Sequence, residues 1–329
     1  FVRAAVAYSE QNFDLEADLL ANYKWYLSSD VPHDANDDEE RLFLRARQAG
    51  ARHNLEIMQI LQIVSDPASG VFFDRTGRVV SNTVPKIAFD FSPQFTIEAM
   101  VNLQIVRFKE DAIADTGDNN MFRGDLSLVY RTAWGFDAVA QAGYFNIEYI
   151  SSESQGAPAD AFGYYYRVGY RGEILPSLSG EVMVGYTSVE SDFFIGTSDD
   201  EEDHTADVSA ALRYEATETV RFTADYSRQF SFAVGEPYQL VNRFLVMGEW
   251  QAVPEVTVRA RFQFDHVDLP SGTERDYMTA GVSAEYKPLP YLTVDGGFAV
   301  RNGETDTGVS ATSTEYDQVI FHIGAALVW

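Results

Sequence analysis

Residues 318–329 alternate between two kinds of side chain. Every second residue, from Val319 to Trp329, is apolar, and the residues between them, such as His322 and Gly324, are smaller and more mixed. A period of two residues is typical of a β-strand whose two faces meet different surroundings. The pattern predicts a strand with one continuous apolar face, and the rest of the chain can be compared with it.

The same alternation recurs along the whole chain. In residues 13–27, apolar side chains such as Phe13 and Leu15 alternate with Asp14 and Glu16. A segment of about fifteen residues exceeds the five or six usual in soluble sheets and is long enough to cross a bilayer at a tilt. Strands are predicted in residues 1–8, 13–27, 41–48, 55–64, 84–91, 95–105, 122–130, 136–144, 164–170, 178–186, 206–214, 220–226, 244–250, 256–264, 278–286, 292–300 and 318–329.

The connections between these segments alternate in kind. One set is tight and often contains proline, and it recurs about every 40 residues. The other set is longer, acidic and rich in Gly and Ser, and includes residues 30–40, 109–119, 151–160, 191–204, 268–274 and 302–317. A regular period of this length indicates a repeated hairpin. Short turns on one side and longer loops on the other are the plan of an outer-membrane β-barrel.

The connections also set the number of strands. Eight tight turns join sixteen segments, and the final segment makes seventeen. Because single-chain bacterial barrels normally have an even number of strands, we expect an all-β, antiparallel, up-and-down transmembrane barrel of about 16–18 strands. It would occupy residues 1–329 as a single domain, with an eighteenth strand before residue 1 favoured over a first segment outside the membrane. Residues 65–82 break the pattern and are expected to form a small external hairpin or a loop folded into the pore.

The second face of the strands carries charges of both signs. A basic side chain facing lipid near the midplane would cost about 2–4 kcal/mol, so this face must point inward. The alternative is a soluble sandwich or a lipocalin-like barrel with the charges outside. A barrel of this size cannot fill its interior and leaves an aqueous space, which excludes that arrangement. The predicted pore-lining residues are Arg123, Asp125, Arg167, Glu181, Arg221, Asp225, Arg243 and Arg259.

Aromatic residues gather at the predicted strand ends. Trp134, Trp250 and Trp329 lie at the tight-turn end, and Trp25 lies at the other. Aromatic girdles at the two membrane interfaces explain this placement. The β-propensity of aromatic residues alone would not sort them to strand ends.

The charge balance limits the partners. Asp and Glu number 50 against 24 Lys and Arg, a net charge of −26, which argues against nucleic acid as a partner. The excess acid falls in the long loops. One run is either a solvated loop face or a site for a divalent cation that bridges to lipopolysaccharide or a partner protein, since carboxylates suit Ca²⁺. Its residues are Asp199, Asp200, Glu201, Glu202 and Asp203. The chain has no cysteine, and no cofactor is predicted.

Two resemblances agree with this fold. His322, Gly324, Leu327 and Trp329 match the C-terminal signal by which the barrel-assembly machinery recognises outer-membrane barrels. The units at residues 212–226 (LRYEATETVRFTADY) and 282–296 (VSAEYKPLPYLTVDG) resemble a family of outer-membrane β-barrel porins associated with exosortase and exopolysaccharide gene clusters. The resemblance implies a bacterial outer-membrane location in contact with lipid and lipopolysaccharide. It also implies a conduit, with secreted polysaccharide as one candidate cargo, and supplies no catalytic residues.

Three functions are compatible with these patterns. A channel for polar solutes or polysaccharide would use the mixed Arg and carboxylate ladders to select what passes. A structural scaffold would sheath or anchor a partner such as a cytochrome, at the acidic loops or in the lumen. Small inner-wall residues would make room for it, namely Gly169, Gly185, Ala211, Gly281, Gly297, Gly324 and Ala326. A hydrolase would need a base, and only His33 and His204 in acidic loops could pair as in omptins, so we expect no enzyme.

Overall fold

Within the residues that it describes, the computed structural model contains one antiparallel sheet of seventeen strands. It describes residues 2–10, 12–24, 37–64, 77–109, 118–150, 160–191, 201–231, 236–289, 292–306 and 314–327. The strands are β1 (Val2–Glu10), β2 (Phe13–Lys24), β3 (Asp37–Ala49), β4 (His53–Val64), β5 (Arg78–Asp90), β6 (Phe95–Phe108), β7 (Asn119–Arg131), β8 (Phe136–Tyr149), β9 (Ala161–Leu175), β10 (Leu178–Ser191), β11 (Glu201–Glu215), β12 (Val220–Ser231), β13 (Gln239–Val253), β14 (Val256–Asp268), β15 (Glu274–Leu289), β16 (Leu292–Asp306) and β17 (Thr314–Leu327).

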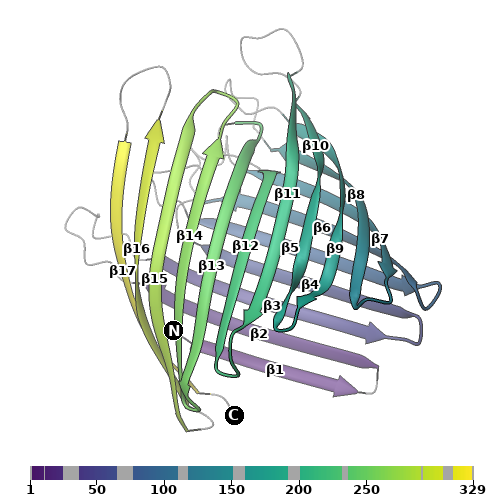
Figure 1. Cartoon of the computed structure of the whole chain (residues 1–329). Helices are drawn as coiled ribbons and strands as arrows, with labels where there is room; N and C mark the ends of the chain where they lie inside the picture. Colours follow the sequence, from purple (N-terminus) through teal and green to yellow (C-terminus); the bar gives the residue numbers. More distant parts are fainter. Residues whose placement is uncertain are drawn as a thin grey trace.

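Each strand pairs with its neighbours in the chain, so the topology is up-and-down. The sheet curls back on itself, and Cα atoms of β1 and β17 approach within 8 Å of each other. Figure 1 shows β11 to β17 in front, crossing the strands β3 to β6 behind them. The predicted all-β barrel and its seventeen strands are therefore confirmed.

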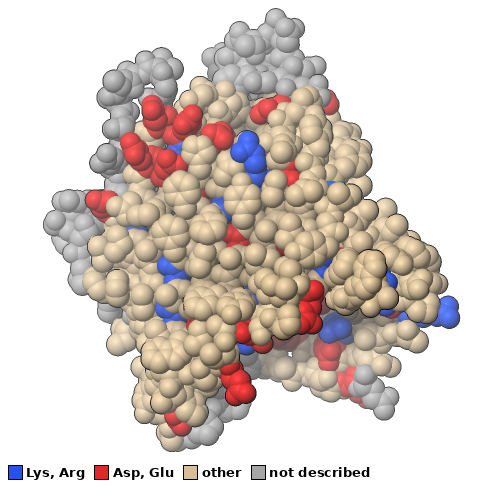
Figure 2. Space-filling model, viewed as in Figure 1, with Lys and Arg blue, Asp and Glu red and all other residues tan. Residues whose placement is uncertain are grey.

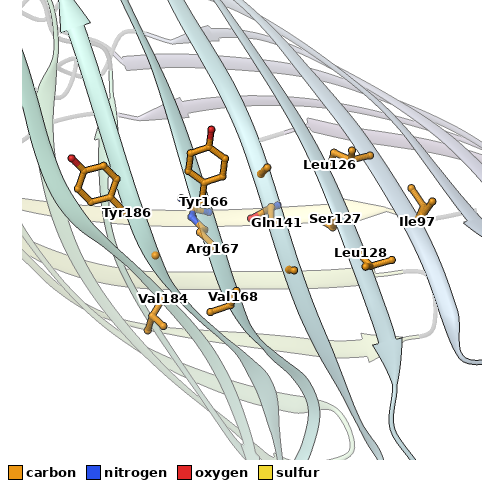
Figure 3. Close-up of a pocket in the computed structure, with 13 residues that line it drawn as sticks. Ile97, Leu126, Ser127, Leu128, Gln141, Tyr166, Arg167, Val168, Val184 and Tyr186 are labelled. Carbon is orange, nitrogen blue, oxygen red and sulfur yellow. The ribbon is translucent and has the colours of Figure 1, made fainter.

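The two faces of this sheet differ as the alternation predicts. Leu126 on β7 and Tyr166 on β9 are exposed on the outer face, whereas Asp125 beside Leu126 is buried inside. Figure 2 shows that the outer surface is mainly uncharged around its middle. An apolar groove of about 660 Å³ lies on this outer face. Figure 3 shows Tyr166 and Val168 of its lining on the near side of the sheet and Arg167 turned away. A lipid-facing exterior is the arrangement that a charged interior requires.

Aromatic side chains mark the tight-turn end of the outer face. Trp134, in the turn between β7 and β8, is 82% exposed, and Trp250 near the end of β13 is also exposed. Tyr130, Tyr214 and Tyr286 join them at the same end of their strands. Residues 25 and 329 lie outside the described part of the chain.

Several strands extend further than the alternation predicts. The acidic residues 37–40 were expected in a loop but begin β3, and residues 201–204 begin β11. Likewise β16 continues to Asp306 and β17 begins at Thr314, inside the loop predicted at 302–317. Beyond the lipid both faces of a strand meet water, so the ladder continues while the apolar alternation stops. Of the segment predicted at 65–82, residues 78–82 belong to β5, and residues 65–76 lie outside the described part.

Within the described residues, no helix is long and apolar enough to cross a membrane.

Candidate functional site in the barrel lumen

A chain of ion pairs crosses the inner face of β11 to β15 near the tight turns. We call it the charge belt, and it consists of Arg213, Glu215, Arg221, Glu249, Arg259, Glu285 and Lys287. The strand register explains it, because Glu215, Arg221, Glu249 and Arg259 stand directly opposite one another on successive strands. Opposite charges at facing positions of neighbouring strands attract and stabilise the sheet.

The contacts in the charge belt are close, and its side chains meet open space. Arg259 Nε lies 2.9 Å from Glu249 Oε2, and its Nη1 lies 3.3 Å from Glu285 Oε2. Arg221 Nη1 lies 3.6 Å from Glu249 Oε1. The Arg221 and Glu249 side chains are 44% and 39% exposed. The belt therefore presents paired but hydrated charges to the lumen.

A recess of about 590 Å³ adjoins the charge belt. Arg213, Arg221, Arg259 and Arg261 line it together with Glu249. Arg261 donates to Gln263 Oε1 at 2.5 Å rather than to a carboxylate. Among the charged residues that line this recess, the basic ones therefore outnumber the acidic ones.

A second set of charges occupies the inner face of β7 to β11, and we call it the corner cluster: Arg123, Asp125, Tyr165, Arg167 and Asp207. The guanidinium groups of Arg123 and Arg167 each lie 4.6 Å from the centroid of the Tyr165 ring. Arg123 Nε donates to the Tyr165 hydroxyl at 3.0 Å, and Arg167 Nη2 donates to Asp207 Oδ2 at 2.6 Å. Cation–π contacts strengthen when they are shielded from water, as these are.

Glycines let this corner close tightly. A Cβ at Gly143 would lie 2.1 Å from Tyr165 Cζ, and one at Gly163 would lie 2.5 Å from Phe145 Cζ. The space over the predicted small residues Gly169 and Gly185 is likewise limited, by Met183 and by the backbone and side chain of Arg167. These glycines therefore accommodate neighbouring residues of the wall instead of leaving room for a threaded chain.

The ends of β12 and β13 leave the wall and enter the lumen. β11 pairs with β12 only from Val208 to Glu215, so residues 201–207 of β11 have no ladder with it. Above this point Arg228 Nε donates to Thr205 Oγ1 at 2.9 Å, and Thr205 is buried on the inner face of β11. We call residues 228–231 and 236–242 the tucked hairpin. The side of the tucked hairpin that continues the lipid-facing side of β12 and β13 lies against the inner face of β8 to β10.

Apolar packing holds the tucked hairpin in place. Phe230 and Leu240 continue the face that carries Phe222 and Phe244 to lipid lower down. Here they are buried with Tyr238 against inward residues of β8 to β10, namely Phe145, Ile147, Tyr149, Ala161, Tyr165 and Val189. The Tyr149 hydroxyl donates to the Glu236 carbonyl at 2.9 Å. A cavity of about 90 Å³ remains between Phe230 and the Arg123 and Arg167 side chains.

The lumen is therefore narrowed at its long-loop end by a segment that the sequence did not indicate. The segment predicted for this role was 65–82, of which the described part is a wall strand. One signal was available. The inner face of β8 carries three large side chains in a row, Phe145, Ile147 and Tyr149, which a strand that lines water does not need.

The comparisons place the chain in a family. Residues 148–327 match the family described as Putative beta-barrel porin 2, which is more than half of the sequence. The chain belongs to this family. Membership places the porin in the bacterial outer membrane. Among curated proteins, none matches the sequence.

Solved structures share the fold at very low identity. The FrpB iron transporter from Neisseria meningitidis (F5-1 variant) has 10% identity and a TM-score of 0.52, over 93% of this chain and 62% of that one. BauA, the ferric preacinetobactin receptor from Acinetobacter baumannii, has 12% identity and a TM-score of 0.51, over 98% of this chain and 66% of that one. The porin spans less than two thirds of the length of these structures, and the likeness concerns the barrel fold alone.

The predicted pore-lining residues fall into distinct groups in the porin. Arg123, Asp125 and Arg167 belong to the corner cluster, and Arg221 and Arg259 belong to the charge belt. Arg243 makes a two-point contact with Asp265 at 2.9 and 3.1 Å. Glu181 accepts from Arg171 Nε at 2.6 Å, and Arg171 also reaches Glu98 at 3.2 Å. The Asp225 side chain makes no hydrogen bond or ion pair with any residue that the structure describes.

The other predicted sites, namely the acidic run, the C-terminal signal and the histidine pair, lie partly outside the described residues. Residues 199 and 200 of the acidic run are outside the described part, residues 201 and 202 begin β11, and Asp203 accepts from the His204 amide at 2.7 Å. The described residues include no group of three or more His, Asp or Glu that could hold a metal ion. In the C-terminal signal, residues 322, 324 and 327 belong to β17. His33, the other half of the omptin-like pair, is outside the described residues.

Proposed function

We propose that this porin is a channel for polar and charged solutes whose long-loop mouth is narrowed by the tucked hairpin. The observation that carries the proposal is the charge belt, a row of hydrated ion pairs on the inner face of a sheet whose outer face is apolar. A packed interior would not favour such a row, because the attraction within a buried ion pair rarely exceeds the free energy lost by removing both charges from water. In an aqueous lumen it costs little and acts on passing solutes.

The arrangement of signs suggests how the belt would act. Arg and Glu alternate across β11 to β14, so the local field runs along the wall instead of attracting one sign of ion strongly. Hydroxyl-rich or zwitterionic solutes can exchange hydrogen bonds with both partners as they pass, whereas apolar solutes gain nothing. We therefore expect selection for hydration and polarity, with only a weak preference by charge.

Single-channel conductance of the purified porin in a planar bilayer tests this function. A steady conductance on the nanosiemens scale, blocked in part by sugars or zwitterionic buffers added to one side, is the expected result. A correctly inserted barrel that passes no current would overturn it. That result would favour the scaffold, in which a partner protein fills the lumen.

Polysaccharide export is a second candidate, and the tucked hairpin bears on it. A polymer wider than the narrowed mouth would need the hairpin to swing back to the wall, where residues 201–207 of β11 lack a ladder with β12. An export conduit should therefore have low conductance at rest and open when the hairpin is displaced. A permanently conducting channel that excludes long glycans would argue against this cargo.

A further inference from the structure

Three polar side chains lie among the lipid-facing residues of β4 and β5. They are Gln59 on β4 and Ser81 and Thr83 on β5. In the strand register Gln59 stands opposite Thr83, and Ser81 stands opposite Leu61. Leu61 is exposed on the outer face, as are Leu103 and Ile105 on β6, which pair with Thr83 and Ser81. We call Gln59, Ser81 and Thr83 the polar seam. It shares its face with the apolar exterior of the barrel, not with the lumen.

The polar seam lies deep in the lipid zone. Six residues separate Gln59 from His53, where β4 begins at the tight-turn end. At about 3.3 Å per residue and a tilt of about 45°, Gln59 lies roughly 14 Å above that end. The apolar band of a barrel is about 25 Å tall, so Gln59 is close to its centre. At similar depth the described outer side chains of other strands are aliphatic, aromatic or glycine, as around Tyr166 and Val168 (Figure 3).

The seam satisfies its own polar groups only in part. Gln59 Nε2 donates to Ser81 Oγ at 3.0 Å and to the Ile60 carbonyl at 3.3 Å, and Thr83 Oγ1 donates to Gln59 Oε1. Both N–H groups of the amide are therefore used, and its oxygen accepts one hydrogen bond. The Ser81 hydroxyl hydrogen has no acceptor among the described residues, and Thr83 Oγ1 keeps a free lone pair. Lipid tails offer a partner for neither group.

We propose that the polar seam is where a second copy of this porin binds within the membrane. An axis along the membrane normal brings identical groups together at the same depth, and a two-fold contact makes the interface self-complementary. The Ser81 hydroxyl hydrogen is a spare donor, and the oxygens of Ser81, Thr83 and Gln59 keep spare lone pairs. When the same groups of two copies meet at the axis, the Ser81 hydroxyl of each copy can donate to an oxygen of the other copy's seam. A lipid molecule cannot supply this match, and an unrelated partner would have to reproduce it at the same depth.

The neighbouring surface allows the close approach that such a contact needs. A groove of about 450 Å³ lies on the outer face below the seam, between Phe13 and Ile87. Ala46, Pro85 and Ala99 line it, and all three are small. Small residues and interfacial hydroxyls are the features that stabilise association in lipid, where apolar side chains gain little by meeting each other.

Disulfide cross-linking in native membranes tests the interface, because the chain contains no cysteine of its own. Leu61→Cys, beside the seam, should give a dimer on mild oxidation, and Leu103→Cys provides a second position if the first fails to insert. The matched control is Val168→Cys, which is equally lipid-facing on β9. Equal and low cross-linking at all three positions would overturn the proposal.

Removing the two hydroxyls tests the mechanism of association. Ser81→Ala with Thr83→Val should weaken dimerisation roughly tenfold, as expected for the loss of two hydrogen bonds between the copies within the membrane. Single-channel conductance per barrel should stay the same, so failure of this interface is distinguishable from failure of the proposed channel. A dimer that is unchanged in this variant would show that the seam does not hold the copies together.

Discussion

The corner cluster and the charge belt use the same chemistry on the same face of one sheet, yet they differ in their surroundings. In the corner the side chains of Arg167 and Asp207 are only 9% and 2% exposed, and the tucked hairpin covers them. In the belt the side chains of Arg221 and Glu249 are 44% and 39% exposed. An inward charge is therefore not by itself a pore-lining charge. The corner cluster holds the wall and hairpin together, and the belt is what a solute can reach.

The largest effect should come from removing one partner of the corner pair. Arg167→Met leaves the Asp207 carboxylate buried without its cation, which should cost about 3–5 kcal/mol of unfolding free energy. Arg221→Met removes an exposed belt cation and should cost about 1 kcal/mol or less. Denaturant unfolding of both variants in the same detergent or lipid measures the difference.

A double variant checks the reason for that difference. Arg167→Met with Asp207→Asn removes both charges and should recover much of the lost stability, because no charge is left buried alone. If Arg167→Met and Arg221→Met lower the free energy of unfolding equally, the corner cluster is not more buried than the charge belt in the way proposed.

The second effect concerns the tucked hairpin. Phe230→Asp with Leu240→Asp places two carboxylates in an apolar cluster, at a cost of several kcal/mol each. The hairpin should then leave the lumen, and single-channel conductance should rise several-fold while the barrel still inserts. Phe230→Leu with Leu240→Met keeps the cluster apolar and should conduct as the unaltered porin does. An unchanged conductance in the aspartate variant would mean that the hairpin does not narrow the pore.

The same contrast shows what the sequence could predict. Period-two alternation fixes which face a residue takes, so the strand number, the inward charges and the lipid-facing exterior follow from it. Alternation does not show whether that face meets lipid, water or another part of the barrel. Phe230 and Leu240 keep the lipid-facing register, and only the departure of β12 from β11 above Val208 turns them onto the inner wall. That departure is a tertiary event with no local pattern.

Burial of charge was equally hidden from the sequence. Arg167 and Arg221 both follow the alternation of an inner face, and nothing nearby in the sequence separates them. The difference arises because the long-loop ends of β12 and β13 fold over Arg167 and not over Arg221. The ion-pair partner of Arg167, Asp207, lies on β11, and Tyr165 fits only because Gly143 faces it on β8.

A moderate effect is expected when the sign of the charge belt is changed. The belt contains one more basic than acidic residue, so Arg221→Gln with Arg259→Gln makes it net negative. The K⁺ to Cl⁻ permeability ratio should rise roughly two- to three-fold at 0.1 M salt and return toward its original value at 1 M, where the screening length falls from about 10 Å to about 3 Å. Reversal potentials in a KCl gradient measure it. The pair Arg123→Gln with Asp125→Asn, which changes corner charges without changing their sum, should leave the ratio unchanged.

The smallest effect distinguishes the inner row of charges from an outer one. Beyond the lipid band, Asp268, Glu274 and Asp306 stand directly opposite one another on β14 to β16, and acidic residues gather at this end of the porin in Figure 2. Like charges that face each other across strands repel. Glu274→Gln should therefore stabilise the barrel by about 0.2–1 kcal/mol, whereas the same change at Glu249, between two arginines, should destabilise it by a similar amount. Both shifts should shrink in high salt, because both positions are exposed. Denaturant midpoints at two salt concentrations measure them, and shifts of the same sign would mean that cross-strand charge does not set the stability of either row.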